Sequence, residues 1–120
     1  MKYNLAFKYR IYPNKEQELL INKTFGCVRF VYNTILYIAN KIYEETGKNK
    51  IITPASLKSE NQFLKEVDSL ALSNAQLNVK RSFTNFFQKR AKFPRFKSKK
   101  NSVKSYTTNC VNNSIRIEEN

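Results

Sequence analysis

The sequence contains no histidine and no tryptophan, and only two cysteines, two glycines and three prolines in 120 residues. The lack of histidine excludes most acid–base and nucleophile pairs of enzymes, and with no CxxC motif it also excludes the usual zinc sites. Cys27 and Cys110 lie far apart, so we expect buried thiols in a reducing compartment rather than a disulfide. No run approaches the roughly 18 apolar residues of a membrane span, and no signal peptide is recognisable.

Acidic residues are missing from one long stretch. Eleven of the 22 basic residues and none of the nine acidic residues lie between Ser69 and Ile117, so this stretch carries most of the formal net charge of +13. A globular surface usually mixes both signs of charge, and the exclusion of acids predicts a surface that faces a polyanion. The alternative is a solvated basic face without a partner. Phe93 and Phe96 lie between the cations in the sequence, which favours the interpretation that this stretch binds a polyanion.

Two helices are predicted in the first third of the chain. Asn14 is a good N-cap, and Gln17 stands at the position that completes a capping box, so a helix should cover Lys15 to about Phe25. Gly26 is expected to break or bend the run. A second helix then covers Cys27–Thr46, and Gly47 closes it as a C-cap glycine.

Two further helices are predicted in the middle of the chain. Thr53 and Pro54 resemble a cap followed by a proline at the first helical position, which starts a short helix to about Phe63. Asp68 then caps a long helix that runs to about Arg90. The apolar face of this helix repeats at steps of three and four residues. It comprises Leu72, Ala75, Val79, Phe83, Phe86 and Phe87.

The two ends of the chain are predicted to form strands. Apolar and polar residues alternate from 3 to 12, which is typical of a half-buried strand. Residues 103–118 are predicted to form a hairpin around Asn112-Asn113, because asparagine tolerates positive φ. The expected fold class is therefore α+β: a small antiparallel sheet interrupted by four helices. Because such a sheet would end with open edges, we expect the chain to be the front part of a longer protein; a complete small protein is the alternative.

Six sequence blocks resemble a known family. They are FKYRIYPNKEQ (7–17), KTFGCVRFVYN (23–33), LKEVDSLAL (64–72), FTNFF (83–87), KFPRFKSKK (92–100) and SYTTN (105–109). In this order they resemble the N-terminal part of the TnpB (OrfB) proteins of insertion sequences, which are often described as transposases with a helix-turn-helix domain. The resemblance covers nearly the whole chain.

The resemblance implies a role in an RNA-guided DNA endonuclease. It implies a wedge-like barrel that begins with residues 1–13, is interrupted by a helical recognition insertion over 14–91, and resumes with the basic FPRF block and hairpin over 92–120. The family's RuvC-like nuclease domain needs divalent metal held by acidic residues, and its zinc finger needs CxxC pairs. This sequence has one aspartate, Asp68, and no CxxC motif. We therefore expect no catalytic residue, no metal site and no cofactor in this chain, and no cleavage by it alone.

The same reasoning gives the expected partners and site residues. DNA and a guide RNA are the expected partners of a monomeric, nucleoid-associated, cytoplasmic prokaryotic protein, with no membrane and no small-molecule substrate. Basic residues supply affinity for a heteroduplex, which is read by shape and backbone. The candidates are Lys80, Arg81, Lys89, Arg90, Lys92, Arg95, Lys97, Lys99, Lys100 and Lys104.

Two smaller groups complete the candidates. By resemblance, the start of the fourth helix, the hairpin tip and the third helix would meet a short DNA motif beside the target. These positions are Ser69, Leu70, Ser73, Val111, Asn112, Pro54 and Lys58. Arg29 and Asn33, one helical turn apart, either reach RNA or DNA or make a hydrogen bond within the protein.

Three alternatives to this interpretation remain. The chain could be a stand-alone helix-turn-helix DNA-binding module, with Gly26 at the turn, although the cations do not lie on a helix that follows Gly26. It could instead be a nonfunctional remnant of a mobile element. An autonomous enzyme is the least supported, because the residues for catalysis are missing.

Overall fold

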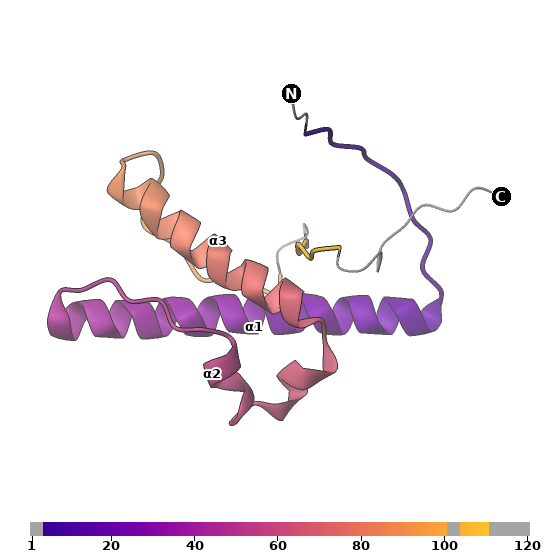
Figure 1. The fold of residues 1–120 in the computed structure, drawn as a ribbon, viewed down its shortest axis with the longest axis horizontal. Helices are drawn as coiled ribbons and strands as arrows, with labels where there is room; N and C mark the ends of the chain where they lie inside the picture. The colour runs from indigo at the N-terminus through magenta and orange to yellow at the C-terminus, as the bar shows by residue number, and fades with distance from the viewer. Residues whose placement is uncertain (1–3, 101–103, 111–120) are drawn as a thin grey trace.

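Two long helices that cross each other form the body of the molecule (Figure 1). The computed structural model describes residues 4–100 and 104–110. The long helices are α1 (Lys15–Thr46) and α3 (Ser69–Phe87); between them lie the short helix α2 (Ala55–Lys58) and the 3-10 helix η1 (Gln62–Glu66). None of the helices in this part of the chain is long and apolar enough to cross a membrane.

The predicted helix caps are confirmed at three ends. Asn14 Oδ1 accepts from the Gln17 amide at 2.9 Å, and Gln17 Oε1 accepts from the Asn14 amide at 2.9 Å, which completes the capping box. Gly47 ends α1 with φ 71°, a left-handed conformation that suits glycine. At the start of α3, Asp68 Oδ1 accepts from the Leu70 amide at 3.0 Å. These caps satisfy backbone groups that the helix ends would otherwise leave without partners.

The predicted break at Gly26 is wrong. Residues 15–46 form one continuous helix, so the two helices expected on either side of Gly26 are a single element. A glycine inside a helix costs only about 1 kcal/mol relative to alanine. The buried stripe of α1 continues in register on both sides of Gly26, from Thr24 through Cys27 and Val31. Packing of this stripe against one partner therefore outweighs the local cost.

The core lies between α1 and α3. From α1, Val31, Ile35 and Leu36 are at most 1% exposed, and Leu72 and Val79 of α3 are fully buried. Val31 and Ile35 lie four residues apart and Leu72 and Val79 seven, spacings that put each pair on one face of its helix. The Tyr32 hydroxyl lies 3.0 Å from Ser82 Oγ and links the two helices beside this interface. Cys27 is a buried free thiol, so no disulfide joins it to Cys110, and burial raises the pKa of the Cys27 thiol.

The segment between the long helices is less helical than predicted. In place of one helix from Pro54 to Phe63, there are the four residues of α2 and then η1. The Thr53 side chain does not cap α2; instead the Thr53 carbonyl accepts from Ser56 Oγ at 2.6 Å. This segment is nevertheless fastened to the core, because Leu64 is fully buried and Leu57 is 9% exposed.

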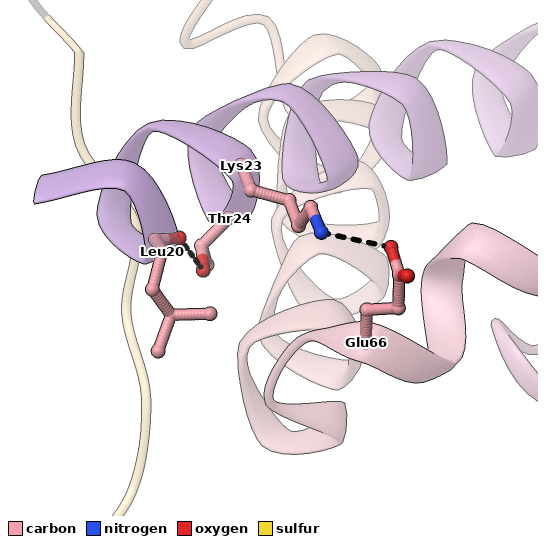
Figure 2. A network of polar contacts seen from close by, with 4 residues as sticks. All are labelled: Leu20, Lys23, Thr24 and Glu66. Carbon is pink, nitrogen blue, oxygen red and sulfur yellow. Dashed lines mark hydrogen bonds and ion pairs between the residues drawn. The ribbon is translucent and has the colours of Figure 1, made fainter. Parts of the chain in front are cut away.

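Figure 2 shows how η1 meets the first half of α1. Lys23 Nζ lies 2.9 Å from Glu66 Oε2, and both side chains are about half exposed. An exposed ion pair of this kind contributes at most about 1 kcal/mol. The next residue, Thr24, is buried, and its hydroxyl donates to the Leu20 carbonyl at 2.7 Å. The buried polar group thus has a partner within its own helix.

Helix α3 ends three residues before the predicted end. Lys89 has φ 61°, the left-handed region, and is the non-glycine residue with positive φ in the described chain. The Arg90 amide donates to the Asn85 carbonyl at 2.8 Å, and the Lys89 amide donates to the Phe86 carbonyl at 3.0 Å. This is the Schellman arrangement, with lysine where glycine is usual. It reverses the chain at the end of α3.

The predicted α+β fold is wrong for the described residues, which contain no strand or sheet. Residues 4–13 run as an extended segment away from the helices (Figure 1). The apolar side chains of the predicted strand, including Leu5, Phe7 and Ile11, are more than 70% exposed. An alternating sequence forms a strand only when another strand accepts its hydrogen bonds. No described segment pairs with it.

The predicted hairpin over 103–118 is also not seen where the structure describes it. Residues 104–110 have no regular secondary structure, and 103 and 111–118, with the Asn112-Asn113 turn, lie outside the described residues. The described chain after α3 turns back towards α1, where Lys97 meets Asn33. We call residues 88–100 together with 104–110 the return segment.

The α1–α3 interface predicts a large difference between two leucines of the same helix. Leu72→Ala should lower the free energy of unfolding by about 2–5 kcal/mol, because Leu72 is fully buried and its loss leaves a cavity. Leu77→Ala is the matched control: Leu77 is 50% exposed, and its loss should cost less than about 1 kcal/mol. Urea unfolding followed by circular dichroism measures both. Equal losses would contradict the described interface.

The end of α3 predicts a stabilising substitution. Lys89→Gly should raise the free energy of unfolding by about 1 kcal/mol, because glycine adopts the left-handed conformation without the steric cost that lysine bears. Lys80→Gly, inside the same helix, should lower it by about 1 kcal/mol. Urea unfolding of the two variants therefore gives opposite signs. A loss of stability in Lys89→Gly would show that the helix ends differently.

Candidate nucleic-acid interface

The return segment is anchored first by Phe93. Its ring lies 5.1 Å from the ring of Phe86 and 5.8 Å from that of Phe83, nearly perpendicular to both. Edge-to-face pairs of this kind add to the stabilisation that burial provides. The structure shows that Phe93 packs on α3, although 47% of its surface stays exposed.

The second anchor joins the return segment to the middle of α1. Asn33 Oδ1 accepts from the Lys97 amide at 2.7 Å, and Asn33 Nδ2 donates to the Lys97 carbonyl at 2.9 Å. The side chain of Asn33 thus pairs with both backbone groups of one residue. Of the two alternatives considered for Asn33, the structure shows the hydrogen bond within the protein.

The side chain of Lys97 is positioned by an aromatic ring. Its Nζ lies 4.8 Å from the centroid of the Tyr32 ring, a cation–π distance. Tyr32 is itself held by its hydroxyl contact to Ser82 of α3. Because both the backbone and the side chain of Lys97 are fixed in this way, its charge has a defined place on the surface.

Three basic residues from distant parts of the sequence line one small pocket. Arg29 comes from α1, and Lys97 and Lys104 come from the return segment. Ser98 and Ser105 add hydroxyl groups, and Phe25 and Val28 complete the lining of a cavity of about 70 Å³. No acidic residue lines it. We call this the cationic pocket; its charges and hydroxyl donors suit an anion such as a phosphate.

The last described part of the return segment reaches the start of α3. The Tyr106 ring lies 5.4 Å from that of Phe25, Thr108 Oγ1 donates to Asp68, and Asn74 Nδ2 lies 3.4 Å from Asn109 Oδ1. The return segment therefore runs back from the end of α3 to its beginning, in contact with α1 between them.

The residues predicted to meet a DNA motif differ in their exposure. Ser69 and Ser73 are exposed on the first turns of α3, beside the point where Thr108 meets Asp68. Leu70 and Lys58 are partly buried, and Pro54 is buried. Val111 and Asn112 lie outside the described residues. The exposed serines are thus the accessible members of this group.

The remaining cations are exposed and have no acidic partner. Among the described residues the one salt bridge is that between Lys23 and Glu66, which involves none of the candidate cations. The exposed candidates are Lys80 and Arg81 on α3 and Lys89, Arg90, Lys92, Arg95, Lys99 and Lys100 on the return segment. Their charge is not neutralised within the described chain.

Sequence reasoning missed several contributors to this surface. Tyr32 was taken for part of a helix block, yet its ring positions Lys97. Ser98 and Ser105 carried no signal, because serines are common in loops. Across the described residues, no three His, Cys, Asp or Glu side chains lie together. This sequence has no CxxC motif and a single aspartate, Asp68, whose Oδ1 caps α3.

Fold and surface together define a small helical module whose candidate cations have no acidic partner among the described residues. A family model described as "Helix-turn-helix domain" matches residues 1–48. Most of the matched range is the single helix α1, without a turn.

Comparison with known proteins assigns the family. The chain is 40% identical to a protein of Streptomyces pristinaespiralis, over 81% of the chain, and 35% identical to InsQ of Escherichia coli (strain K12), over 82%. Both are named as candidate RNA-guided DNA endonucleases. It is also 39% identical to the virulence protein VsdF of Salmonella dublin, over 78% of the chain and 92% of VsdF. The chain belongs to the TnpB (OrfB) family and corresponds to its N-terminal part. It spans 26% of the length of each of the first two relatives.

The Asn33–Lys97 pairing predicts local loosening when Asn33 is removed. Asn33→Ala should speed hydrogen exchange at the Lys97 amide and lower the free energy of unfolding by about 1–2 kcal/mol, because two hydrogen bonds are lost. Asn22→Ala, an exposed position on the same helix, is the control and should leave that amide protected. An unchanged Lys97 amide in Asn33→Ala would contradict the anchor.

Proposed function

We propose that this chain binds nucleic acid through its sugar–phosphate backbone, as the N-terminal, DNA-binding part of a TnpB-like RNA-guided DNA endonuclease. The cationic pocket carries the proposal. Arg29, Lys97 and Lys104 are far apart in the sequence but line one hollow without an acid. Such a convergence suits a phosphate, whereas a merely solvated basic face would spread its charges apart. The names of the two longer relatives support the choice of polymer.

The return segment would then be the main contact surface. It carries eight of the ten candidate cations, and three anchors hold it against the helices: Phe93, the Asn33–Lys97 pairing, and Thr108 on Asp68. Charges held in fixed places bind a regular polyanion with a smaller loss of side-chain entropy than charges on a loose tail. We propose a guide RNA–target DNA duplex as the polymer, because its backbone shape can be read without base contacts.

A second contact is proposed at the start of α3. Ser69 and Ser73 are exposed there, next to Thr108 and Asn109 of the return segment. We propose that this end meets the short DNA motif beside the target, with Leu70 and Lys58 as flanking contacts. Serine hydroxyls both donate and accept hydrogen bonds, so they can contact any base edge. Cleavage is proposed to belong to other parts of such an endonuclease.

The stand-alone helix-turn-helix function receives less support from the geometry. Its description comes from the matched family, but α1 has no turn at Gly26 and therefore no separate recognition helix after it. A helix-turn-helix module would use Arg29 without Lys97 or Lys104. In the structure all three residues line the cationic pocket. The two functions therefore differ in whether Lys104 contributes to nucleic-acid binding.

The cationic pocket predicts a change in salt dependence. Fluorescence anisotropy of a labelled RNA–DNA duplex, titrated at several salt concentrations, gives the slope of log affinity against log salt. Arg29→Ala and Lys104→Ala should each reduce this slope by about one phosphate contact, roughly 0.9, and weaken binding at every salt concentration. Lys65→Ala, an exposed lysine of η1, is the matched control and should change neither quantity.

Three outcomes would count against the proposal. Binding that is lost equally in all three variants would indicate a diffuse charge effect. Loss confined to Arg29→Ala would favour the helix-turn-helix function. No measurable binding by the unmodified chain would contradict the proposed function itself.

A further inference from the structure

A second cavity lies at the other end of the return segment. It is enclosed by the C-terminal ends of α1 and α3 and by the beginning of the return segment, and has a volume of about 230 Å³. Five of the side chains that line it are aromatic, which is a large share for a chain with 16 aromatic residues in all. We call it the aromatic basin; its rings are those of Tyr43, Phe83, Phe86, Phe87 and Phe93.

The rings of the aromatic basin are only partly used by the core. Phe83 is 5% exposed and belongs to the core, but Tyr43, Phe87 and Phe93 are 52%, 50% and 47% exposed. Phe93 stands nearly perpendicular to Phe83 and Phe86. These contacts hold the Phe93 ring in place while about half of its surface remains open. A rigid, half-open ring is suited to stacking against a planar ligand.

Polar groups lie within the same cavity. Asn40 of α1 and Asn49, just after Gly47, contribute the two remaining side chains of the lining. Neither side-chain amide makes a hydrogen bond within the described part of the chain. Each amide offers one acceptor oxygen and two donor hydrogens. The aromatic basin therefore combines stacking surfaces with groups that can meet the polar edge of a nucleobase.

The charge around the aromatic basin restricts its occupant. Lys89, Arg90 and Lys92 are exposed in the turn that leads from α3 to Phe93. Glu44 and Glu45 follow Tyr43 in the sequence but do not line the cavity. A second copy of this chain, with a net charge of +13, would bring cations against cations. An anionic polymer that carries planar groups meets both the rings and the charges.

We propose that the aromatic basin binds one unpaired nucleobase of a nucleic acid whose phosphates contact the neighbouring cations. The base stacks on the open faces of Phe93 and Phe87, and its edge meets Asn40 and Asn49. Stacking on aromatic side chains beside a basic groove is the general way in which proteins hold single-stranded nucleic acid. This inference rests on the proposed function, because it needs a nucleic acid bound at the basic surface.

The test separates the base from the backbone. Two labelled single strands of equal length and equal phosphate charge are compared by fluorescence anisotropy: a thymidine oligonucleotide and a strand whose residues are all abasic. The unmodified chain should bind the thymidine strand roughly ten-fold more tightly, because only that strand offers a base to stack. Phe93→Ala should remove most of this difference. Because Phe93 also anchors the return segment, its loss can lower the affinity for both strands by the same factor, so the ratio of the two affinities is the readout. Phe63→Ala, with a similarly exposed ring outside the cavity, is the matched control and should keep the difference.

Each outcome decides the inference. Equal binding of the two strands by the unmodified chain would overturn it and leave the proposed function standing. If Phe93→Ala lowers the affinity for both strands alike and leaves their ratio unchanged, Phe93 is purely structural and the stacking role is overturned. Absence of binding to either strand would contradict the proposed function and this inference together. If Phe93→Ala does not fold, as judged by circular dichroism, Asn40→Ala and Asn49→Ala decide instead. Together they should reduce the ten-fold difference at least two-fold, and an unchanged difference would overturn the inference.

Discussion

The packing of α1 against α3 is the interaction on which the rest of this structure depends. Val31 and Ile35 of α1 and Leu72 and Val79 of α3 are fully excluded from water, and their burial supplies the main driving force of folding. Because the buried stripe of α1 packs in this interface, α1 continues through Gly26 without a break. Every functional element described above is attached to one or both of these helices.

The basic surface depends on this core because the return segment has no regular structure of its own. Its cations are placed by contacts with side chains of the two helices: Phe93 on Phe86, and Lys97 on Asn33 and Tyr32. These contacts order a chain that would otherwise repel itself, since it carries many positive charges and no acid. A polyanion would relieve that repulsion, which is one physical reason for the proposed function.

The described residues 4–12 and 104–110 show where pattern alone misleads. Residues 4–12 alternate as a strand does, yet Leu5 and Phe7 are exposed, because a strand requires hydrogen-bond partners that no described segment supplies. The β-formers of 104–110 instead make side-chain contacts, through Tyr106 and Thr108, with the helices. The periodicity of apolar residues predicts which side chains share a face of a helix or strand. It does not report whether a second element is present to cover that face.

The sequence by itself determined three of the helix caps, the apolar faces of the long helices, the family and the excess of positive charge. These features are local or additive: a cap such as Asn14 depends on neighbours within four residues, and charge depends only on composition. Only the tertiary structure decided that α1 is continuous and that Arg29, Lys97 and Lys104 line one pocket. Those outcomes depend on contacts between residues distant in sequence, whose energies are set by packing and not by the pattern of any one segment.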